Sequence, residues 1–207
     1  MRPQIHPTAE IEPGIEIGPG TAVWSHVHVR AQARIGSDCI VGEKTYIGPG
    51  VEVGNRVKLN AFVYVCAGVV IEDGVMVSAG GIFTNDRYPR ATTPDLQTLR
   101  DSAPEPGMPT TFVREGATIG AGAVIGPGLE IGRFAMVGMG AVVTRSIAPF
   151  HLVTGNPATT VGCVCRCARP LLRVTSGAIP DAGDVECAAC GLRYKIHAGE
   201  VAESAAP

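Results

Sequence analysis

The chain repeats an apolar residue at every sixth position over most of its length. Stepping by six from Ile5, every position up to Phe83 is apolar, and the same register resumes from Val113 to Val143. Apolar residues make up 45% of the chain, so 20 apolar positions out of 20 would arise by chance with a probability on the order of 10⁻⁷. The chain is therefore built from hexapeptide repeats.

A period of six excludes the two simplest secondary-structure patterns. An α-helix places apolar residues three or four positions apart, and an amphipathic strand places them two apart. Six fits a short strand followed by a sharp corner, and glycine, which often follows the apolar anchor, tolerates the positive φ of such a corner. Three hexads close one triangular coil, so residues 18 apart stack, and the 20 hexads predict an all-β fold, a parallel β-helix of six to seven coils. The glycines that follow anchors are Gly18, Gly36, Gly42, Gly48, Gly54, Gly120, Gly126, Gly132 and Gly138.

The period lapses between Phe83 and Val113 and then resumes in the same register. This gap is rich in proline, and a long structureless loop in a compact domain is usually functional or disordered. We interpret residues 84–112 as a loop excursion from one corner of the coil stack. The expected organisation is a β-helix domain over residues 1–161, a small unit over 162–195 and a flexible tail over 196–207.

Five of the 7 cysteines fall in the last quarter of the chain. Cys165, Cys167, Cys187 and Cys190 form two pairs with the ligand spacing of a zinc ribbon, and four thiolates close a tetrahedral, structural zinc site. Cys163 is an alternative ligand, and a set of free cysteines is the alternative interpretation. The first residues lack the apolar segment of a secretory signal, which disfavours a disulfide framework. A metal would supply folding free energy that so small a unit lacks.

The formal net charge is −2, and charged residues make up 17% of the chain. This near-neutral balance lacks the basic surface that nucleic acid or an anionic membrane would attract. No apolar run is long enough for a membrane helix. We therefore expect no nucleic-acid partner, no membrane partner and a cytoplasmic protein.

The hexads and the segment Gly155-Asn156-Pro157-Ala158 resemble the hexapeptide acyltransferases over roughly residues 5–161. Residues 83–91, Phe-Thr-Asn-Asp-Arg-Tyr-Pro-Arg-Ala, resemble the signature loop of bacterial N-acetyltransferases that acetylate the 3-amino group of nucleotide-linked sugars. Val23-Trp24 and Val27-His28-Val29 also match that subfamily. The resemblance implies a left-handed winding, a homotrimer that acts between subunits, acetyl-CoA as cosubstrate and a UDP- or dTDP-linked amino sugar as acceptor, for cell-surface polysaccharide or glycan biosynthesis.

Two residues are candidates for catalysis. Asn85 lies at the mouth of the excursion, where its amide can orient the amine or polarise the thioester carbonyl; the alternative is an asparagine that caps a turn. His28 stacks with Tyr46, Tyr64 and Ile82 by the 18-residue rule, on an edge that could line a groove between subunits. Histidine is the usual proton acceptor near neutral pH, but the same column also suits a plain ladder of subunit-interface residues.

Four residues are candidates for binding the acceptor. Asp86 can accept a hydrogen bond from the sugar amine or its hydroxyls, and Arg90 can clamp a phosphate or a sugar carboxylate. A solvated loop and a surface ion pair are the respective alternatives. Asn60 and Tyr64 lie in residues 58–64, which loosely resemble the Gln/Asn-rich segment of the subfamily.

Small residues in the late coils would let the extended pantetheine arm of coenzyme A lie along the stack and bond to the backbone. The alternative explanation of these glycines is corner geometry alone. The resemblance implies that a basic residue meets the phosphates and that the 155–158 loop flanks the adenine end. The candidate coenzyme residues are Gly120, Gly138, Gly140, Ala141, Arg145, Asn156 and Pro157.

Other functions stay open at this point. An O-acetyltransferase of the same superfamily would acetylate a sugar or serine hydroxyl, and a non-catalytic β-helix would act as a binding protein. The intact excursion motif argues against the second. A carbonic anhydrase would need three histidines converging on zinc, and only His26 and His28 fall within the coils.

Overall fold

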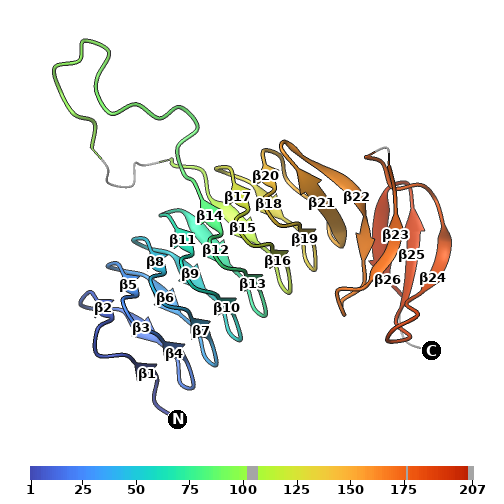
Figure 1. The fold of residues 1–207 in the computed structure, drawn as a ribbon, viewed down its shortest axis with the longest axis horizontal. Helices are drawn as coiled ribbons and strands as arrows, with labels where there is room; N and C mark the ends of the chain where they lie inside the picture. Colours follow the sequence, from blue (N-terminus) through green and yellow to red (C-terminus); the bar gives the residue numbers. More distant parts are fainter. Residues whose placement is uncertain (102–106, 176, 205–207) are drawn as a thin grey trace.

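The computed structural model describes residues 1–101, 107–175 and 177–204. These residues form strands, turns and loops, with no helix among them. Two-residue and three-residue strands wind into a parallel β-solenoid whose walls are three sheets, and the last strands form a smaller sheet beyond its end (Figure 1). The all-β parallel β-helix predicted from the period is confirmed. Within the described residues, no helix is long and apolar enough to cross a membrane.

The three walls take successive strands in turn. The ten-stranded sheet contains β1 (Gln4–Ile5), β4 (Ala22–Val23), β7 (Ile40–Val41), β10 (Lys58–Leu59), β13 (Met76–Val77), β16 (Thr118–Ile119), β19 (Met136–Val137), β21 (His151–Gly155), β22 (Ala158–Val164) and β23 (Pro170–Arg173). The seven-stranded sheet contains β2 (Glu10–Ile11), β5 (His28–Val29), β8 (Tyr46–Ile47), β11 (Tyr64–Val65), β14 (Ile82–Phe83), β17 (Val124–Ile125) and β20 (Val142–Val143). The six-stranded sheet contains β3 (Glu16–Ile17), β6 (Arg34–Ile35), β9 (Glu52–Val53), β12 (Val69–Ile71), β15 (Thr111–Val113) and β18 (Glu130–Ile131).

Strand pairing follows the predicted step of three hexads, as in the pair Val29 and Ile47. Across the excursion the step in sequence is longer, yet Ile71 still pairs with Val113, so the coil resumes in register. The stack also extends beyond the six to seven predicted coils to about eight, because eight parallel strands from β1 to β21 follow one another in one sheet. The last coil is two residues shorter, which moves its apolar positions out of the strict period: Val137 pairs with Val153.

The anchor side chains point inward and form one continuous core. From Val23 onward, every anchor through Val143 is buried. Two threonines inside this core have their hydroxyls satisfied by the next coil: Thr21 donates to the carbonyl of Gly36 and Thr45 to that of Asn60. The interior therefore contains aliphatic side chains and paired hydroxyls.

The glycines that follow anchors have a different purpose from the one predicted. Gly42, for example, does not have a positive φ. A Cβ there would lie 2.5 Å from the carbonyl carbon of Asn60 on the next coil, closer than non-bonded atoms approach. These glycines let the coils stack closely, and the positive φ falls two residues later instead, where Lys44 and Phe62 adopt 58° and 61°. A non-glycine residue with this left-handed φ lowers stability by about 1 kcal/mol.

The excursion leaves the solenoid at the corner between the seven-stranded and six-stranded sheets, after β14 and before β15 (Figure 1). Thr84 still bonds to the carbonyl of Ile125, and β15 begins at Thr111. The excursion thus ends two residues earlier than predicted. Residues 102–106, within the predicted excursion, lie outside the described residues.

The boundary between the solenoid and the C-terminal unit, which we define as residues 162–204, is less sharp than predicted. β22 spans residue 161 and pairs antiparallel with β21 on one side and with β23 on the other. The ten-stranded sheet therefore continues from the solenoid into the C-terminal unit. A three-stranded antiparallel sheet follows: β24 (Gly183–Glu186), β25 (Arg193–His197) and β26 (Glu200–Glu203). The expected flexible tail is wrong for residues 196–204, because Ile196 and Val201 are buried in this sheet.

Candidate functional site

A cavity of about 1370 Å³ lies between the root of the excursion and the adjoining coils. The coil side contributes Arg30 after β5, the first residues of β8 and β11 and residues of the turns that follow, and the excursion contributes residues on both of its arms. The cavity therefore joins the corner of the stack to the predicted signature loop. Its lining includes Arg30, Tyr46, Tyr64, Cys66, Asn85, Asp86, Arg90, Arg100 and Met108.

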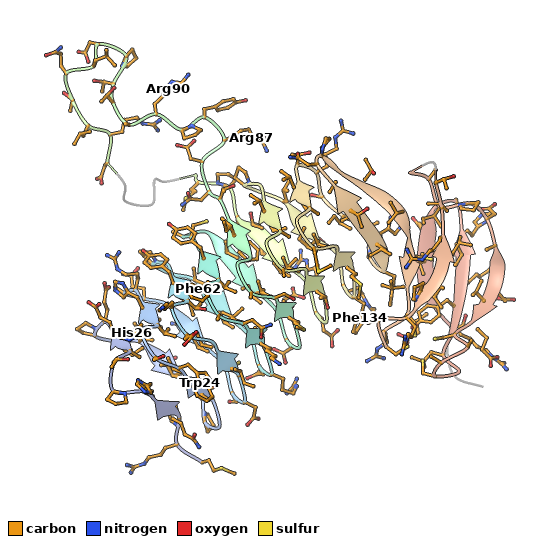
Figure 2. All side chains as sticks on the ribbon, in the orientation of Figure 1. Trp24, His26, Phe62, Arg87, Arg90 and Phe134 are labelled. Atoms are coloured by element: carbon orange, nitrogen blue, oxygen red, sulfur yellow. The ribbon has the colours of Figure 1, made fainter. Side chains whose placement is uncertain are left out.

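Three of the predicted acceptor-site residues meet Asn85 at this cavity. Asn85 follows β14 by two residues, and its Nδ2 lies 3.3 Å from Met108 Sδ, a weak acceptor. Asp86 Oδ1 accepts the N–H of Tyr88 at 2.7 Å, which closes a local turn. Arg90 lies further along the excursion and donates to the carbonyl of Pro89 (Figure 2). The Asn85 amide thus contacts a thioether rather than a strong acceptor, on the wall of the cavity.

The predicted column of aromatic residues is confirmed on the seven-stranded sheet. His28 pairs with Tyr46, Tyr46 with Tyr64, and Tyr64 with Ile82. The two tyrosine rings stack at 5.0 Å, and the His28 ring meets Tyr46 edge-on at 5.6 Å. Burial raises the pKa of the Tyr64 phenol above its ordinary value of about 10, at which a phenol is already protonated at neutral pH. Tyr46 and Tyr64 line the cavity, so both are available as hydrogen-bond donors there.

His28 lies apart from this cavity within one chain. Its strand, β5, precedes β14 by three coils, and coils are spaced about 4.8 Å apart, so His28 and Asn85 are separated by about 14 Å along the stack. The Nε2 atom of His28 is buried without a hydrogen bond, and the nearest carboxylate oxygen, from Glu12, is 3.5 Å away. The structure therefore does not bring the two predicted catalytic residues together in one protomer.

An ion pair that the sequence analysis missed anchors this edge of the stack. Glu12 bonds to Arg30 and also accepts the N–H of Ala31 at 2.6 Å, and these bonds lower the pKa of the Glu12 carboxyl, that from Ala31 most. Arg30 in turn donates to Tyr46 Oη at 3.1 Å. Glu12 and Arg30 are separated by one full coil, so the same stacking rule could have found them.

Asn60 lies at a different corner from the other acceptor candidates. It follows β10, where its N–H bonds to Val77 and its carbonyl accepts the hydroxyl of Thr45. This corner joins the ten-stranded sheet to the seven-stranded sheet, whereas Asn85 occupies the corner joining the seven-stranded and six-stranded sheets. Asn60 does not line the cavity.

The glycine-rich candidates for coenzyme binding share the corner of Asn60. Gly120 and Gly138 stack directly, and a Cβ on Gly120 would lie 2.6 Å from the carbonyl carbon of Gly138. Gly140 has a φ of 65°, and a Cβ there would meet nothing within 4 Å, so its surroundings are open. Ala141 differs from the prediction, because its methyl group is buried in the core. Its backbone N–H is also bonded, to Gly138.

The hairpin between β21 and β22 continues the glycine corner beyond the last coil. A Cβ on Gly138 would lie 2.7 Å from the Thr154 methyl group, and Thr154 leads directly to the exposed tip at Asn156 and Pro157, whose peptide bond is cis. Arg145, by contrast, follows β20 and so lies at the excursion corner, two coils beyond Asn85. The seven predicted coenzyme residues therefore divide between two corners.

The four predicted metal-ligating cysteines come together. Their Sγ atoms all lie within 4.8 Å of one another, with Cys165 and Cys190 at 3.4 Å and Cys167 and Cys187 at 3.6 Å. A tetrahedral zinc with Zn–S bonds of about 2.3 Å places its sulfurs about 3.8 Å apart, so this set fits that ion. Cys163 is buried nearby but is not part of the cluster.

A family model described as the hexapeptide repeat of succinyl-transferase matches residues 32–71 and 114–145. A curated relative, dTDP-3-amino-3,6-dideoxy-alpha-D-galactopyranose 3-N-acetyltransferase of Aneurinibacillus thermoaerophilus, is 39% identical over 93 residues. The match covers 45% of this chain and 44% of the relative. The chain thus aligns with less than half the length of that relative.

Two solved structures share the fold. AntD, an N-acyltransferase from Bacillus cereus in complex with dTDP and 3-hydroxybutyryl-CoA, is 19% identical with a TM-score of 0.53, and the match covers 80% of this chain and 82% of AntD. PerB from Caulobacter crescentus, in complex with CoA and GDP-perosamine, is 22% identical with a TM-score of 0.51, covering 78% of this chain and 58% of PerB. The chain contains hexapeptide repeats and shares the fold of these two structures, and over 93 residues its sequence is similar to that of a dTDP-amino-sugar N-acetyltransferase.

Proposed function

We propose that the protein is an acetyl-CoA-dependent N-acetyltransferase that acts on the amino group of a UDP- or dTDP-linked amino sugar, for cell-surface polysaccharide or glycan biosynthesis. The observation that carries this proposal is the cavity at the excursion corner, which Asn85, Asp86 and Tyr64 line together. The named activity of the aligned relative supports the choice of an amine acceptor. The ligands bound to AntD and PerB support a CoA thioester donor.

The transfer requires few catalytic groups. The sugar amine attacks the thioester carbonyl carbon, the new C–N bond forms as the C–S bond breaks, and the departing CoA sulfur takes up the proton that the amine loses. A positioned amine and thioester supply much of the rate, since effective molarities reach about 10⁵–10⁸ M. Protein groups need to align the two reactants and stabilise the developing oxyanion.

The cavity residues fit these tasks. The amide of Asn85, opposite only a thioether, donates to the carbonyl oxygen of the thioester or orients the amine. Asp86 Oδ2 lies outside the local turn, 3.9 Å from Arg100 Nη1, and this oxygen accepts from the amine or a sugar hydroxyl. Arg90 and the phenol of Tyr64 bind the diphosphate and the sugar. His28 and Asn60 would join this site only from another subunit.

The acyl donor needs a long, open path. The glycine corner offers one, because Gly120, Gly138 and Gly140 present backbone without side chains and lead to the exposed hairpin tip at Asn156 and Pro157. The pantetheine arm would lie along this corner, with the adenine end near the tip. Arg145 would meet the phosphates only from the opposite corner, so we assign it to a neighbouring subunit's coenzyme.

A homotrimer would bring the two corners together. From β5 to β20, the outward positions of the seven-stranded sheet are aromatic or aliphatic, and Tyr64 and Ile82 remain 46% and 40% exposed. Trp24 and Phe62, at the edge of the ten-stranded sheet, are also exposed (Figure 2). The six-stranded sheet instead presents charged residues such as Glu52. Contiguous exposed apolar surface marks an interface, so we propose that subunits meet through the seven-stranded face.

The cysteine cluster has a separate role in this scheme. Cys165 and Cys167 lie beyond the last coil, with Cys187 and Cys190, whereas the cavity opens after β14. Four thiolates fill the tetrahedral sites of zinc and leave none for substrate. We therefore assign a structural zinc to the cluster, and we propose that the protein acts in the cytoplasm.

An acceptor screen tests the proposed function. The protein is incubated with acetyl-CoA and UDP- or dTDP-linked amino sugars, each matched with its hydroxyl analogue, and released thiol and product mass are measured. Acetylation of amines alone is the expected result. Acetylation of the hydroxyl analogues would assign an O-acetyltransferase, and no turnover on any acceptor would assign a binding protein.

A further inference from the structure

The four clustered cysteines come from two different sheets. Cys165 and Cys167 lie on the loop between β22 and β23, which extends the ten-stranded sheet of the solenoid. Cys187 and Cys190 lie on the loop between β24 and β25 of the three-stranded sheet. An ion held by all four thiolates would therefore connect the solenoid to a sheet that, among the described residues, has no strand pairing with it.

We propose that one zinc ion at Cys165, Cys167, Cys187 and Cys190 fastens the three-stranded sheet onto the end of the solenoid, so that the C-terminal unit is a metal-locked cap on the last coil. This assignment concerns the architecture of the chain and does not depend on the proposed transferase activity. A solenoid needs such a cap because its last coil has no following coil to cover it.

The two loops are shaped as ligand-bearing turns. In the first, the N–H of Cys165 bonds to Arg169 and that of Ala168 bonds back to Cys165. In the second, the N–H of Cys187 bonds to Leu192 and that of Gly191 bonds back to Cys187. Each turn is therefore closed by its own backbone hydrogen bonds, and the ion would join the two turns.

A second layer of contacts orients the ligands. Tyr194 is fully buried, and its Oη lies 3.1 Å from Cys165 Sγ while accepting the N–H of Arg166 at 3.0 Å. The N–H of Cys167 also points at Cys165 Sγ, at 3.5 Å. Groups that hold the ligands in this way tune metal sites. Cys165 and Cys187 are buried and the other two are exposed, so the ion would sit at the rim of the small core.

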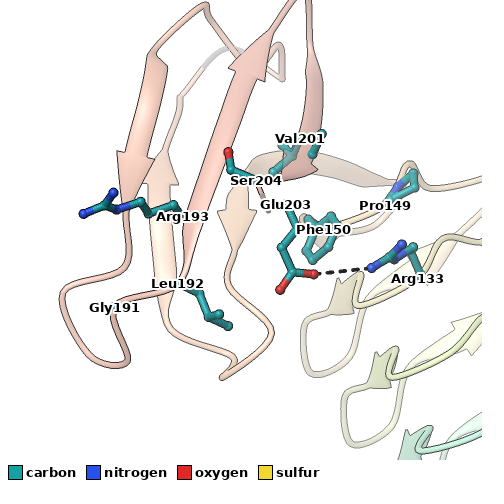
Figure 3. Close-up of a pocket in the computed structure, with 10 residues that line it drawn as sticks. Arg133, Pro149, Phe150, Gly191, Leu192, Arg193, Val201, Glu203 and Ser204 are labelled. Atoms are coloured by element: carbon teal, nitrogen blue, oxygen red, sulfur yellow. Dashed lines mark hydrogen bonds and ion pairs between the residues drawn. The ribbon is translucent and has the colours of Figure 1, made fainter. Parts of the chain in front are cut away.

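Apart from the cysteines, the three-stranded sheet shares a small core with the end of the solenoid, in which Phe150 packs with Tyr194 and Val201. Phe134 and Phe150 of the last coils stack at 5.5 Å, and Phe150 meets Tyr194 edge-on at 5.5 Å. Arg133 and Arg166 both pair with Glu203 on β26, at 3.5 Å and 3.3 Å. A groove of about 840 Å³ remains beside these contacts, between Phe150 and Val201 (Figure 3).

This arrangement explains why a metal is needed. Exposed ion pairs contribute little to stability, and a sheet of three short strands cannot build a sufficient core alone. Metal binding supplies folding free energy directly. Loss of the ion should therefore release the three-stranded sheet while the long core of the solenoid stays folded.

Elemental analysis and hydrogen–deuterium exchange of the full chain test the proposal. We expect one zinc per chain, and far less in the double variant Cys187→Ser/Cys190→Ser. Cys163→Ala is the matched control, because this buried thiol is next to the cluster but outside it; it should keep its zinc. On removal of zinc from the wild-type chain by a chelator, amides of β24–β26 should lose protection and those of β4–β14 should keep it.

Three results would overturn the proposal. The first is a purified chain that holds no zinc after expression with zinc present. The second is unchanged protection of β24–β26 after the zinc is removed, which would mean that the ion fastens nothing. The third is loss of protection throughout β4–β14, because the ion would then stabilise the solenoid itself. None of these results depends on whether the acceptor screen detects transfer.

Discussion

In the solenoid, each coil buries the same kind of side chain against the coil before it, whereas in the C-terminal unit a few aromatic residues surround four cysteines. The core of the solenoid runs without interruption from Val23 to Val153, and that of the C-terminal unit is a separate, smaller cluster around Tyr194. The first region spreads its stability over many equivalent contacts. The second concentrates it in one site, so single substitutions should affect the two regions differently.

The largest expected effect is in the solenoid core at the root of the excursion. Phe83 is fully buried, so Phe83→Ala should lower the free energy of unfolding of the solenoid by about 3–5 kcal/mol. Denaturant unfolding would measure this loss, with zinc content unchanged. An equal loss in the zinc-depleted chain and the zinc-bound chain would confirm that the two regions are independent; a loss of zinc in the Phe83→Ala variant would show that they are coupled.

The next effect separates two kinds of glycine in the stack. A Cβ on Gly42 would lie 2.5 Å from Asn60, while a Cβ on Gly50 would meet nothing within 4 Å. Gly42→Ala should force coils apart and cost about 1–3 kcal/mol, and Gly50→Ala should cost only about 1 kcal/mol for its left-handed φ. Thermal unfolding of both variants would measure the difference. Equal costs would contradict the close-stacking explanation.

Transferase activity should depend on residues of the solenoid and its excursion rather than on the C-terminal unit. Asn85→Ala should lower kcat/KM for the true acceptor by about 10-fold or more, equivalent to roughly 1.4 kcal/mol of transition-state stabilisation. The melting temperature and zinc content should stay the same. As a matched control, Gln97→Ala changes an exposed amide elsewhere on the excursion and should leave kinetics unchanged. Wild-type kinetics for Asn85→Ala would show that this residue only shapes a turn.

A smaller effect tests the surroundings of the cysteine cluster. Tyr194→Phe keeps the buried ring but removes the hydroxyl that contacts Cys165 and Arg166. Because such supporting groups typically change metal affinity by about 10- to 100-fold, zinc affinity should fall by about 10-fold. Competition with a chelator would measure the change. Unaltered affinity would mean that Tyr194 contributes packing alone.

The smallest expected effect is a decrease in the stability of the solenoid at acidic pH. The N–H and side chain of Asn55 and the nearby Arg56 lower the pKa of Asp73, the N–H of Asn55 most. A carboxyl with a lowered pKa stabilises the folded state above its unfolded pKa of about 3.9, and this stabilisation is lost as the pH falls through the lower, folded value. The melting temperature should therefore decrease below about pH 4, and less steeply in Asp73→Asn. If the melting temperatures of the wild type and Asp73→Asn fell in parallel with pH, Asp73 would not be the group responsible.

The two regions also differ in how far the sequence could predict them. In the solenoid, the 18-residue coil fixes which side chains stack, so the column from His28 to Tyr64 followed from counting alone. The reason for Gly42 was mistaken because a six-residue period specifies a corner without giving the distance between coils. The sequence analysis did not predict that Arg145 and Gly140 lie at different corners of the stack. It grouped the coenzyme residues by resemblance, although their positions within the coil already place them at different corners.

The C-terminal unit has no such period. Its pairs β24–β25 and β25–β26 depend on contacts that no local pattern specifies, so the sequence placed Val201 in a flexible tail. The cysteine cluster was predicted correctly because ligand spacing is itself a local signal. The sequence did not predict that the two cysteine pairs lie on loops of two different sheets. That placement depends on how the residues between the pairs fold.

The excursion begins and ends in register, and this has a consequence for how the chain can vary. Since Val69 still pairs with Thr111 as though the intervening loop were absent, the stack is insensitive to the length of what is inserted there. Closing a flexible loop costs only about 0.6 kcal/mol more for each doubling of its length. Loops of other lengths and chemistries can therefore be exchanged at this corner while the solenoid folds as before, so the proposed acceptor side of the site can change independently of the coils.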